Sequence, residues 1–519
     1  MTVALEKTYA EAAERRRSLA LHGAVLAAGT GSMATEICAS RLLAPYYGSS
    51  TVVWANVIGL VLASLSLGYW LGGRLADRRP SRTVLGAVVT AAALAIAAVP
   101  FLAQPFLDVA VRGLDRLSAG AVIGSFLGAL VLFAPPVILL GMVTPFAIRL
   151  AVDDVRTAGA VAGRIFALST AGSLVGTFLP ALVTIPLVGT QRSLLAAAAL
   201  SALGGALLLG PRWVVVAAAV AALLAIPPGA VKASAGLLYE TESPYQYVQV
   251  VQNGGARELY LNEGVAVHSV WRPDTVLTGD EWDMFLAVPP LLGRPVRRVA
   301  ILGNAGGTTA RAMGVFYPSA RIDGVELDPA VTAAGRRFLG LGDNPRLHVV
   351  DADARPFLRR THTRYDLIAI DAYRQPYVPF YLATREFFRL VRERLAPGGV
   401  VALNVATVPG DHRLAEGIAG TLATELPEVV TWQALRFNQL VVGLSAPLPR
   451  SVLARRLESG PRRLGGLRAL LAAGMRRAAP SRDPWTDDRA PVEWITDRMI
   501  VEFAARGGKV DEPLLPTAP

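Results

Sequence analysis

The stretch VAILGNAGGTTARA, residues 299–312, decides the fold of the C-terminal half of this chain. It starts with an apolar run of strand length, passes through a turn containing Gly303, Gly306 and Gly307, and continues into helix-forming residues. Because glycine has no side chain, such a turn lets the backbone approach a ligand closely. We therefore expect a nucleotide-like ligand where this strand meets the following helix.

Strands and helices alternate with short connections after this turn, which predicts a parallel sheet with helices on both faces. The preceding segment, 237–272, is β-rich around Asn253-Gly254-Gly255, a hairpin signal, and a helix-like segment follows at 281–292. The expected strands are 297–303, 320–327, 346–351, 365–372 and 400–405, and the expected helices are 308–317, 328–340, 352–360 and 384–399.

Acidic residues lie at the ends of successive expected strands, as Glu326, Asp353 and Asp371. In a parallel sheet the carboxyl ends of the strands share one edge, and ligands bind there. A carboxylate in the position of Glu326 accepts hydrogen bonds from ribose hydroxyls. The glycine-rich turn alone suits a dinucleotide or S-adenosylmethionine. The turn lacks G-x-G-x-x-G spacing, and Asp353 lies where adenosylmethionine-type sheets place the adenine amino group, so an adenosylmethionine-like nucleoside is favoured.

The first half of the chain has the composition of a membrane protein. Of 519 residues, 53% are hydrophobic and 18% charged, with a mean hydropathy of +0.42. Long apolar runs are confined to residues 18–228, and a membrane span needs about 20 such residues. The expected spans are 19–40, 52–75, 83–104, 120–148, 160–187, 191–210 and 212–228, of which the last is short enough to lie at the interface instead.

The distribution of arginine predicts the orientation of these spans. Arg15–Arg17 and the loops at 74–82 and 149–164 are rich in arginine, whereas the alternate loops carry few, so the N-terminus is expected in the cytoplasm. Six crossings return the chain to the cytoplasm, and seven place the C-terminal domain outside. A cytosolic nucleoside favours a cytoplasmic catalytic domain on a multi-pass protein of the cell membrane.

Charge and cysteine content exclude several classes of function. The net charge of +11 comes largely from arginines near span ends and at 449–482, which favours anionic lipid headgroups over nucleic acid as the partner. A single cysteine, Cys38, excludes an intrachain disulfide and a multi-cysteine metal site, and no metal is expected. Two carboxylates in or beside spans, Glu36 and Asp77, are candidates for function, for helix–helix hydrogen bonds or for a position near the interface.

Five short motifs occur in an order and spacing that resemble the spermidine synthase (polyamine aminopropyltransferase) family. They are ESPYQYVQV (242–250), ILGNAGGTTAR (301–311), GVELDP (324–329), DADARPFL (351–358) and YDLIAIDAY (365–373). The resemblance covers roughly residues 237–445. Further segments resemble the bacterial branch with an N-terminal multi-span membrane domain, namely SRLLAPYYGSS (40–50), GGRLADRR (72–79) and TDDRAPVEW (486–494).

The resemblance implies an aminopropyltransferase that uses decarboxylated S-adenosylmethionine as co-substrate, with no tightly bound cofactor. The aminopropyl group would pass to a polyamine such as putrescine, and methylthioadenosine would be released. Asp371 would take the proton from the attacking amine, because a protonated amine has no lone pair. The residues implied for the nucleoside are Gln246, Gly303, Gly306, Gly307, Glu326, Asp353 and Ala354.

Three positions depart from the pattern of the family and affect the substrate side of the site. Ala305 replaces an aspartate of the turn, Arg374 replaces a second acid three residues after Asp371, and Glu281-Trp282-Asp283 replaces a Tyr-His-Glu set. A charge reversal at close range costs several kcal/mol in a partly buried site. Aromatic residues nearby would enclose an ammonium group or simply pack. The expected substrate residues are Trp282, Asp283, Tyr373, Arg374 and Tyr377.

We therefore expect an all-α transmembrane bundle (1–232), a β-hairpin entry region (233–272), a Rossmann-like domain of the adenosylmethionine-methyltransferase type (273–505) and a flexible tail (506–519). The departures leave two alternatives open. One is an adenosylmethionine-dependent transferase that acts on a nonpolyamine substrate, and the other is a nucleoside-sensing, transporter-like membrane protein. The expected partners are a polyamine, the lipid bilayer and a second copy of the chain, as a homodimer or homotetramer formed through the soluble domain.

Overall fold

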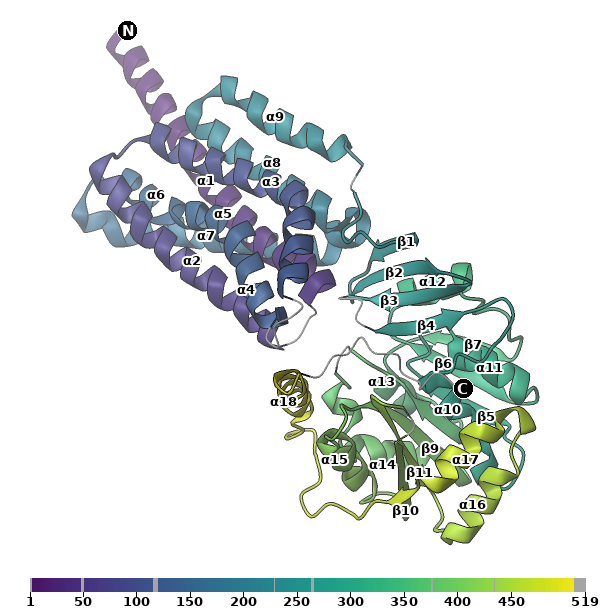
Figure 1. The fold of residues 1–519 in the computed structure, drawn as a ribbon. Helices are drawn as coiled ribbons and strands as arrows, with labels where there is room; N and C mark the ends of the chain where they lie inside the picture. The colour runs from purple at the N-terminus through teal and green to yellow at the C-terminus, as the bar shows by residue number, and fades with distance from the viewer. Residues whose placement is uncertain are drawn as a thin grey trace. The chain divides into compact units, whose positions relative to one another are not determined.

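The computed structural model describes residues 2–47, 51–114, 120–227, 229–262, 266–374, 377–433 and 435–507. The chain divides into two compact units (Figure 1). The first unit comprises Met1–Ser234 together with the short segments Glu240–Tyr247 and Asn262–Gly264, and the second comprises the rest. Apart from its first two residues, the tail expected over 506–519 lies outside the described residues.

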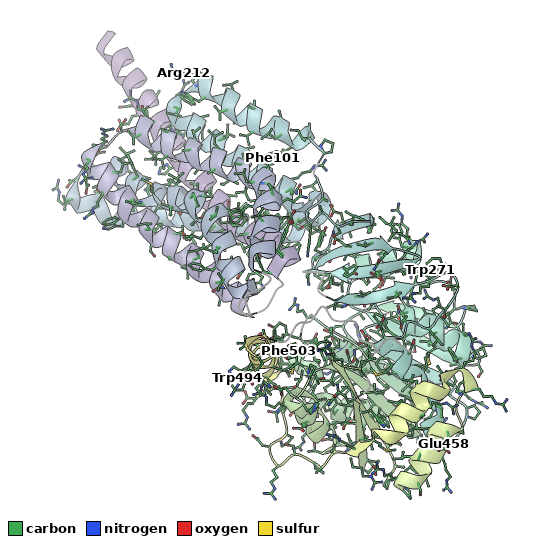
Figure 2. All side chains as sticks on the ribbon, viewed as in Figure 1. Phe101, Arg212, Trp271, Glu458, Trp494 and Phe503 are labelled. Atoms are coloured by element: carbon green, nitrogen blue, oxygen red, sulfur yellow. The ribbon has the colours of Figure 1, made fainter. Side chains whose placement is uncertain are left out.

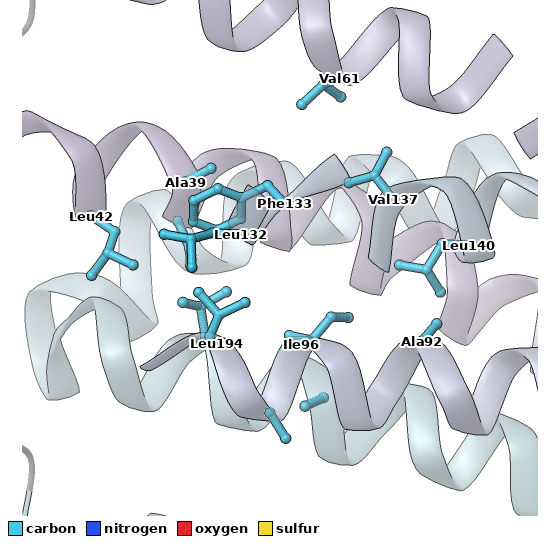
Figure 3. Close-up of a cluster of buried hydrophobic side chains, with 14 of the residues drawn as sticks. Ala39, Leu42, Val61, Ala92, Ile96, Leu132, Phe133, Val137, Leu140 and Leu194 are labelled. Carbon is cyan, nitrogen blue, oxygen red and sulfur yellow. The ribbon is translucent and has the colours of Figure 1, made fainter. Parts of the chain in front are cut away.

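The first unit is built from helices only, apart from its two short segments. Long runs of alanine, leucine and valine form these helices, and their buried faces meet in one core that includes Ile96, Phe133, Leu140 and Leu194 (Figure 3). The helices are α1 (Thr2–Tyr47), α2 (Thr51–Arg78), α3 (Arg82–Leu114), α4 (Gly120–Leu132), α5 (Ala134–Gly141), α6 (Val143–Ala151), α7 (Ala158–Leu179), α8 (Ile185–Leu209) and α9 (Val214–Ala222). The expected span at 120–148 thus corresponds to three shorter helices in succession.

Among the described residues of this unit, four helical stretches are long and apolar enough to cross a bilayer: Val53–Arg78, Arg82–Val111, Ala134–Ala151 and Val155–Leu209. The last of these stretches contains a break at Gly189, whose φ of 82° is not helical. Large apolar side chains are exposed around the unit, among them Leu62 and Phe178. Phe101, labelled in Figure 2, is another. The helical region is therefore apolar outside as well as inside.

The second unit contains an eight-stranded sheet with the strand order β12-β10-β11-β9-β8-β5-β6-β7. The pairs formed among β5 (Arg298–Leu302), β6 (Arg321–Glu326), β7 (Leu347–Asp351), β8 (Tyr365–Ile370) and β9 (Leu395–Ala406) are parallel. The strands β10 (Glu428–Gln433), β11 (Asn438–Leu444) and β12 (Arg476–Arg477) add antiparallel pairs at one edge. The expected Rossmann-like α/β domain is confirmed.

Alternate residues of the central strands fill two separate cores on the two faces of this sheet. On β8, Leu367 and Ala369 face one core, and Ile368 and Ile370 face the other. This pattern is why the strand reads as a continuous apolar run. The helices around the sheet are α10 (Glu281–Leu286), α11 (Thr308–Phe316), α12 (Pro329–Phe338), α13 (Ala354–Arg360), α14 (Arg385–Arg394), α15 (Arg413–Leu422), α16 (Arg450–Glu458), α17 (Gly465–Ala473) and α18 (Val492–Ala505).

The β-rich segment forms a separate sheet in the order β1-β2-β3-β4. Its strands are β1 (Leu237–Glu242), β2 (Tyr247–Asn253), β3 (Ala256–Leu261) and β4 (Val267–Trp271). Asn253 pairs with Ala256, so β2 and β3 are joined by the two-residue turn Gly254-Gly255. The expected hairpin is present, and a strand on each side extends it to four strands.

Candidate active site

The glycine-rich turn and the expected catalytic acid lie against each other at the carboxyl ends of β5 and β8. The amide of Asp371 donates a hydrogen bond of 2.8 Å to the carbonyl of Leu302. Gly303 follows with a φ of 86°, and a Cβ at this position would lie 2.4 Å from the carbonyl oxygen of Asp371. Only glycine allows this approach, so Gly303 brings the turn and the acid together.

The other glycines of the turn serve packing as well as backbone conformation. Gly307 has a φ of 89° and precedes the first residue of α11. The amide of Gly306 donates a hydrogen bond of 2.8 Å to the Ser269 hydroxyl, and a Cβ at Gly306 would lie 2.4 Å from the Leu339 side chain. Ala305, directly before Gly306, has a φ of 44°, which is unfavourable for a residue with a Cβ.

Glu326, at the end of β6, is held by the backbone of this turn. Its carboxylate accepts hydrogen bonds from the amides of Ala305 (2.9 Å) and Asp328 (3.0 Å). Burial raises the pKa of Glu326 to about 7, against the effect of these amides. Each carboxylate oxygen has a second lone pair, and the ribose hydroxyls expected here would use these lone pairs.

A buried amide in the same turn lacks a partner among the described residues. The side chain of Asn304 is 5% exposed, and neither its nitrogen nor its oxygen makes a hydrogen bond there. A buried polar group without a partner is unfavourable unless a ligand or water satisfies it. Together with Glu326, Asn304 gives the turn the polar groups that a nucleoside requires.

Asp353 and Ala354 begin α13, as a nucleoside site at this sheet edge requires. One oxygen of Asp353 accepts a hydrogen bond of 2.9 Å from the amide of Arg355, and the other accepts one of 3.0 Å from the hydroxyl of Tyr381. Ala354 is buried beneath the start of the helix. The carboxylate expected at the adenine is therefore held in one orientation from two sides.

Asp371 lies at the centre of a network of polar side chains. Its carboxylate accepts a hydrogen bond of 2.9 Å from the side-chain amide of Asn404 on β9 and another from the side chain of Trp282 on α10. Burial raises the pKa of Asp371 to about 6, and the two hydrogen bonds oppose this shift. The residue is nonetheless partly accessible, so the acid can reach a substrate.

Glu281 is the residue of this cluster that the sequence did not identify as a site residue. It is the first residue of α10, and its charge interacts with that of Asp371. Burial, and then the charge of Asp371, raise the pKa of Glu281 to about 8. The signal was present in the segment Glu281-Trp282-Asp283, whose first acid replaces the tyrosine expected from the family.

Asp283 is engaged in its own loop. Its carboxylate accepts hydrogen bonds from the amides of Thr278 (3.1 Å) and Gly279 (2.8 Å). Burial raises its pKa, against these bonds. The substrate role expected for Asp283 stays a prediction, with a loop-stabilising role as the simpler explanation.

The aromatic residues after Asp371 are held in place through their hydroxyl groups. The Tyr373 hydroxyl donates a hydrogen bond of 2.9 Å to the carbonyl of Asn404 and accepts one of 2.7 Å from the amide of Ala406. The Tyr377 hydroxyl donates to the carboxylate of Asp497 on α18. These bonds fix the positions of the hydroxyls. The expected contact between the ring faces and an ammonium group stays a prediction.

Arg374 and Gln246, two further expected site residues, lie outside this network. The side chain of Arg374 is exposed, and its backbone closes a turn with Tyr377. Gln246 belongs to the first unit, where its amide donates a hydrogen bond of 3.0 Å to the Ser243 hydroxyl. The nucleoside contact expected of Gln246 stays a prediction. Over the described ranges, no cluster of three or more histidine, cysteine or acidic side chains is arranged to hold a metal ion.

The chain is similar to proteins named as polyamine aminopropyltransferases and spermidine synthases. The family described as "Spermine/spermidine synthase domain" matches residues 283–426. A probable polyamine aminopropyl transferase from Bifidobacterium longum is 33% identical over 279 residues, which are 53% of this chain and 58% of the relative. The chain thus spans less than two thirds of that relative. A crystal structure of a probable spermidine synthase from Corynebacterium glutamicum is 18% identical, with a TM-score of 0.37, and covers 55% of this chain and 99% of its own.

A longer match extends beyond the second unit. A polyamine aminopropyltransferase from Corynebacterium efficiens is 30% identical over an alignment of 397 positions, which covers 66% of this chain and 73% of the relative. A match of this length exceeds the second unit and therefore includes part of the helical unit. On this similarity, with the motifs and the matched domain, the chain belongs to the spermidine synthase (polyamine aminopropyltransferase) family.

Proposed function

We propose that the chain is a membrane-bound aminopropyltransferase that uses decarboxylated S-adenosylmethionine to extend putrescine or a related amine. The observation that carries this proposal is the position of Asp371, buried yet partly accessible, directly beside the glycine-rich turn. The turn, Glu326 and Asp353 hold the nucleoside. The reacting carbon beside the sulfonium then lies between the nucleoside and Asp371.

In the reaction, the amine nitrogen attacks the carbon beside the sulfonium. A nitrogen–carbon bond forms as the carbon–sulfur bond breaks, and its electron pair neutralises sulfur to give methylthioadenosine. The proton from the amine passes to Asp371. A group with a pKa of about 6 is ionised at neutral pH and is still basic enough to accept this proton.

Glu281 supports the binding of the amine in this proposal. The acid expected at position 374 is an arginine with an exposed side chain, whereas Glu281 contributes an acid next to Asp371. Before substrate binds, the proximity of the two acids favours a proton on Glu281. A cationic amine replaces that proton and is then held between two carboxylates.

The direct test is to incubate detergent-solubilised protein with putrescine and decarboxylated S-adenosylmethionine. Formation of spermidine and methylthioadenosine in equal amounts is the expected result. Turnover of ordinary S-adenosylmethionine without either product would instead support the alternative, a transferase acting on a nonpolyamine substrate, which Ala305 and Arg374 favour. Movement of polyamine across sealed vesicles that Asp371→Asn leaves unchanged would support a transporter.

We also propose that the first unit is embedded in a bilayer, with the N-terminus in the cytoplasm. Its apolar helices and its exposed apolar side chains support this proposal. The arginine-rich loop at 74–82 joins α2 to α3, and the one at 149–164 includes the connection from α6 to α7. Asp77 and Arg149 form an ion pair of 3.3 Å between these two loops, so both lie at one end of the unit.

Contacts within the first unit suggest where the chain leaves the bundle. Val231 accepts a hydrogen bond of 2.8 Å from the Tyr46 hydroxyl, and Glu242 accepts one of 2.6 Å from the amide of Thr190. Tyr46 lies at the end of α1 remote from Arg15–Arg17, and Thr190 directly follows the break at Gly189 in α8. These contacts favour seven crossings, with Pro211–Ala225 as a short last one. These contacts support an exit of the chain after residue 229 on the outer side, whereas the proposed cytosolic nucleoside supports the expected cytoplasmic location, and a labelling experiment distinguishes the two.

Single-cysteine variants test this topology, because Cys38 is the only cysteine and is buried. In a Cys38→Ser background, Arg482→Cys places a thiol on the second unit, and Asp154→Cys places one in an arginine-rich loop. A membrane-impermeant maleimide should label Arg482→Cys in intact spheroplasts, and Asp154→Cys only after permeabilisation. Labelling of both only after permeabilisation would put the second unit in the cytoplasm. Size measurement in detergent tests the expected homodimer or homotetramer.

A further inference from the structure

The carboxylate expected at the adenine is oriented by a residue from the C-terminal part of the chain. Asp353 accepts hydrogen bonds from the backbone amide of Arg355 and from the hydroxyl of Tyr381, and the Arg355 side chain links both residues to Asp487. The Arg355 guanidinium donates two hydrogen bonds to the Asp487 carboxylate, at 2.8 and 2.6 Å. It donates a third, at 3.1 Å, to the carbonyl of Tyr381. One guanidinium therefore connects Asp487 to both residues that hold Asp353.

The position of Asp487 is itself fixed from two directions. The Thr384 hydroxyl donates a hydrogen bond of 2.7 Å to the Asp487 carboxylate. The backbone amide of Asp487 donates one of 3.1 Å to the Glu386 carboxylate. The Arg355 side chain is almost buried and so requires a counter-charge. The bidentate geometry of the pair makes the connection directional as well as strong. The same guanidinium holds the pKa of Asp487 below its usual range.

We propose that Asp487 is a positioning residue for the nucleoside, acting through Arg355 and Tyr381 on Asp353. Without its charge, the buried guanidinium would turn to other acceptors, and the start of α13 and Tyr381 would shift with it. Asp353 would then be presented to the adenine in several orientations. The proposal rests on the proposed function only in taking the nucleoside to be the aminopropyl donor.

A purely structural role for the pair would give a different result. If Asp487 only attached the segment after β12 to the domain, its loss would lower stability and leave the affinity of the folded protein unchanged. A matched control lies four residues earlier, where Asp483 pairs with Arg489 and both side chains are exposed. Asp483→Asn removes a charge from the same segment without affecting Arg355.

The experiment compares Asp487→Asn and Asp483→Asn in the full-length chain. Calorimetry measures the affinity for methylthioadenosine, kinetics give KM for the donor and kcat, and the melting temperature reports folding. For Asp487→Asn we expect affinity to fall and donor KM to rise about tenfold, with kcat within about threefold. Asp483→Asn should match the wild type. Wild-type affinity and KM in Asp487→Asn would overturn the proposal.

A second variant, Tyr381→Phe, keeps the test decisive if Asp487→Asn does not fold. It removes only the hydroxyl by which Tyr381 contacts Asp353. As in Asp487→Asn, donor KM should rise and methylthioadenosine affinity should fall. Unchanged values would contradict the proposal. If the wild type binds methylthioadenosine but transfers no aminopropyl group, the proposed function fails, and the affinities still decide the role of Asp487. If the wild type binds no nucleoside, both fail.

Discussion

The side-chain amide of Asn404 donates a hydrogen bond of 2.9 Å to the carboxylate of Asp371. The side-chain oxygen of Asn404, Oδ1, accepts a hydrogen bond of 2.9 Å from the side-chain amide of Asn438 on β11. The second bond fixes which end of the Asn404 amide faces the acid. A residue of β9, held in turn by a residue of the antiparallel strand β11, therefore orients the proposed catalytic group.

Removal of this hydrogen bond should shift the pH profile. Burial raises the pKa of Asp371, and the bond from Asn404 opposes that rise. In Asn404→Ala the pKa should rise further, so the rising limb of kcat/KM, near pH 6 in the wild type, should move up by about half to one unit. A lower kcat/KM with an unmoved profile would mean that Asn404 acts only in packing.

Asp371→Asn should abolish turnover and spare binding. The amide cannot accept the proton of the amine, so kcat should fall by about 10²–10⁴-fold. Methylthioadenosine affinity, measured by calorimetry, should stay within about threefold. The matched control is Asp351→Asn, an exposed acid at the end of β7, which should keep the wild-type kcat. Equal loss of turnover and of nucleoside binding in Asp371→Asn would indicate a structural role.

Glu281→Gln should change how stability depends on pH. Burial and the charge of Asp371 raise the pKa of Glu281 to about 8 in the folded state, so folding favours its protonated form. The stabilisation that comes from protonated Glu281 is fully present below the pKa of this group in the unfolded chain, near 4.5, and is lost as pH rises through about 8. The variant should melt near the wild-type temperature at pH 5 and above it at pH 9. A constant difference between the two proteins would rule out this titration.

Arg374→Asp should improve binding of the amine. Its side chain is exposed, so the charge reversal is screened and weaker than expected for a partly buried site. KM for putrescine should fall about three- to tenfold, with donor KM unchanged. Arg364→Asp makes the same change at the start of β8, away from Asp371, and serves as the control. If both variants lower KM equally, only the overall charge matters.

Ala305→Gly should stabilise the second unit. Ala305 has a φ of 44°, where a Cβ is strained by about 1–2 kcal/mol, part of which glycine loses to the entropy of the unfolded chain. The melting temperature should rise slightly. The same substitution at Ala310, buried in α11, should lower it by removing packing and helix propensity. A lower melting temperature for Ala305→Gly would show that the methyl group packs usefully.

Local patterns were enough to predict the parallel half of the sheet. The strands from β5 to β8 are apolar runs closed by glycine or acidic residues, and each lies within two residues of its expected bounds. The strand β9 was also expected, but it begins earlier than predicted. The strands β10 and β11 were not predicted, because their connection at 434–437 reads Ala-Leu-Arg-Phe and contains no turn-forming residue. Hairpins without such residues give no local signal.

The candidate site was predictable to the extent that its residues lie at strand ends. Glu326, Asp353 and Asp371 stand next to apolar runs, so position alone suggests their location. Asn404 and Asp487 act on acids that are 33 and more than 100 residues away, and only the folded sheet brings them together. Long-range polar partners of this kind leave no periodic signal in the sequence.

The bond between Arg355 and Asp487 joins residues 132 positions apart, and this has a consequence for biosynthesis. At about 5–20 residues per second, the ribosome needs on the order of ten seconds to reach Asp487 after Arg355 has been made. A nascent or prematurely terminated chain carries Asp353 without the clamp that orients it. Such a product should fold its parallel strands and still bind the nucleoside weakly. If Asp487 has the proposed role, full nucleoside binding requires that translation has passed this residue.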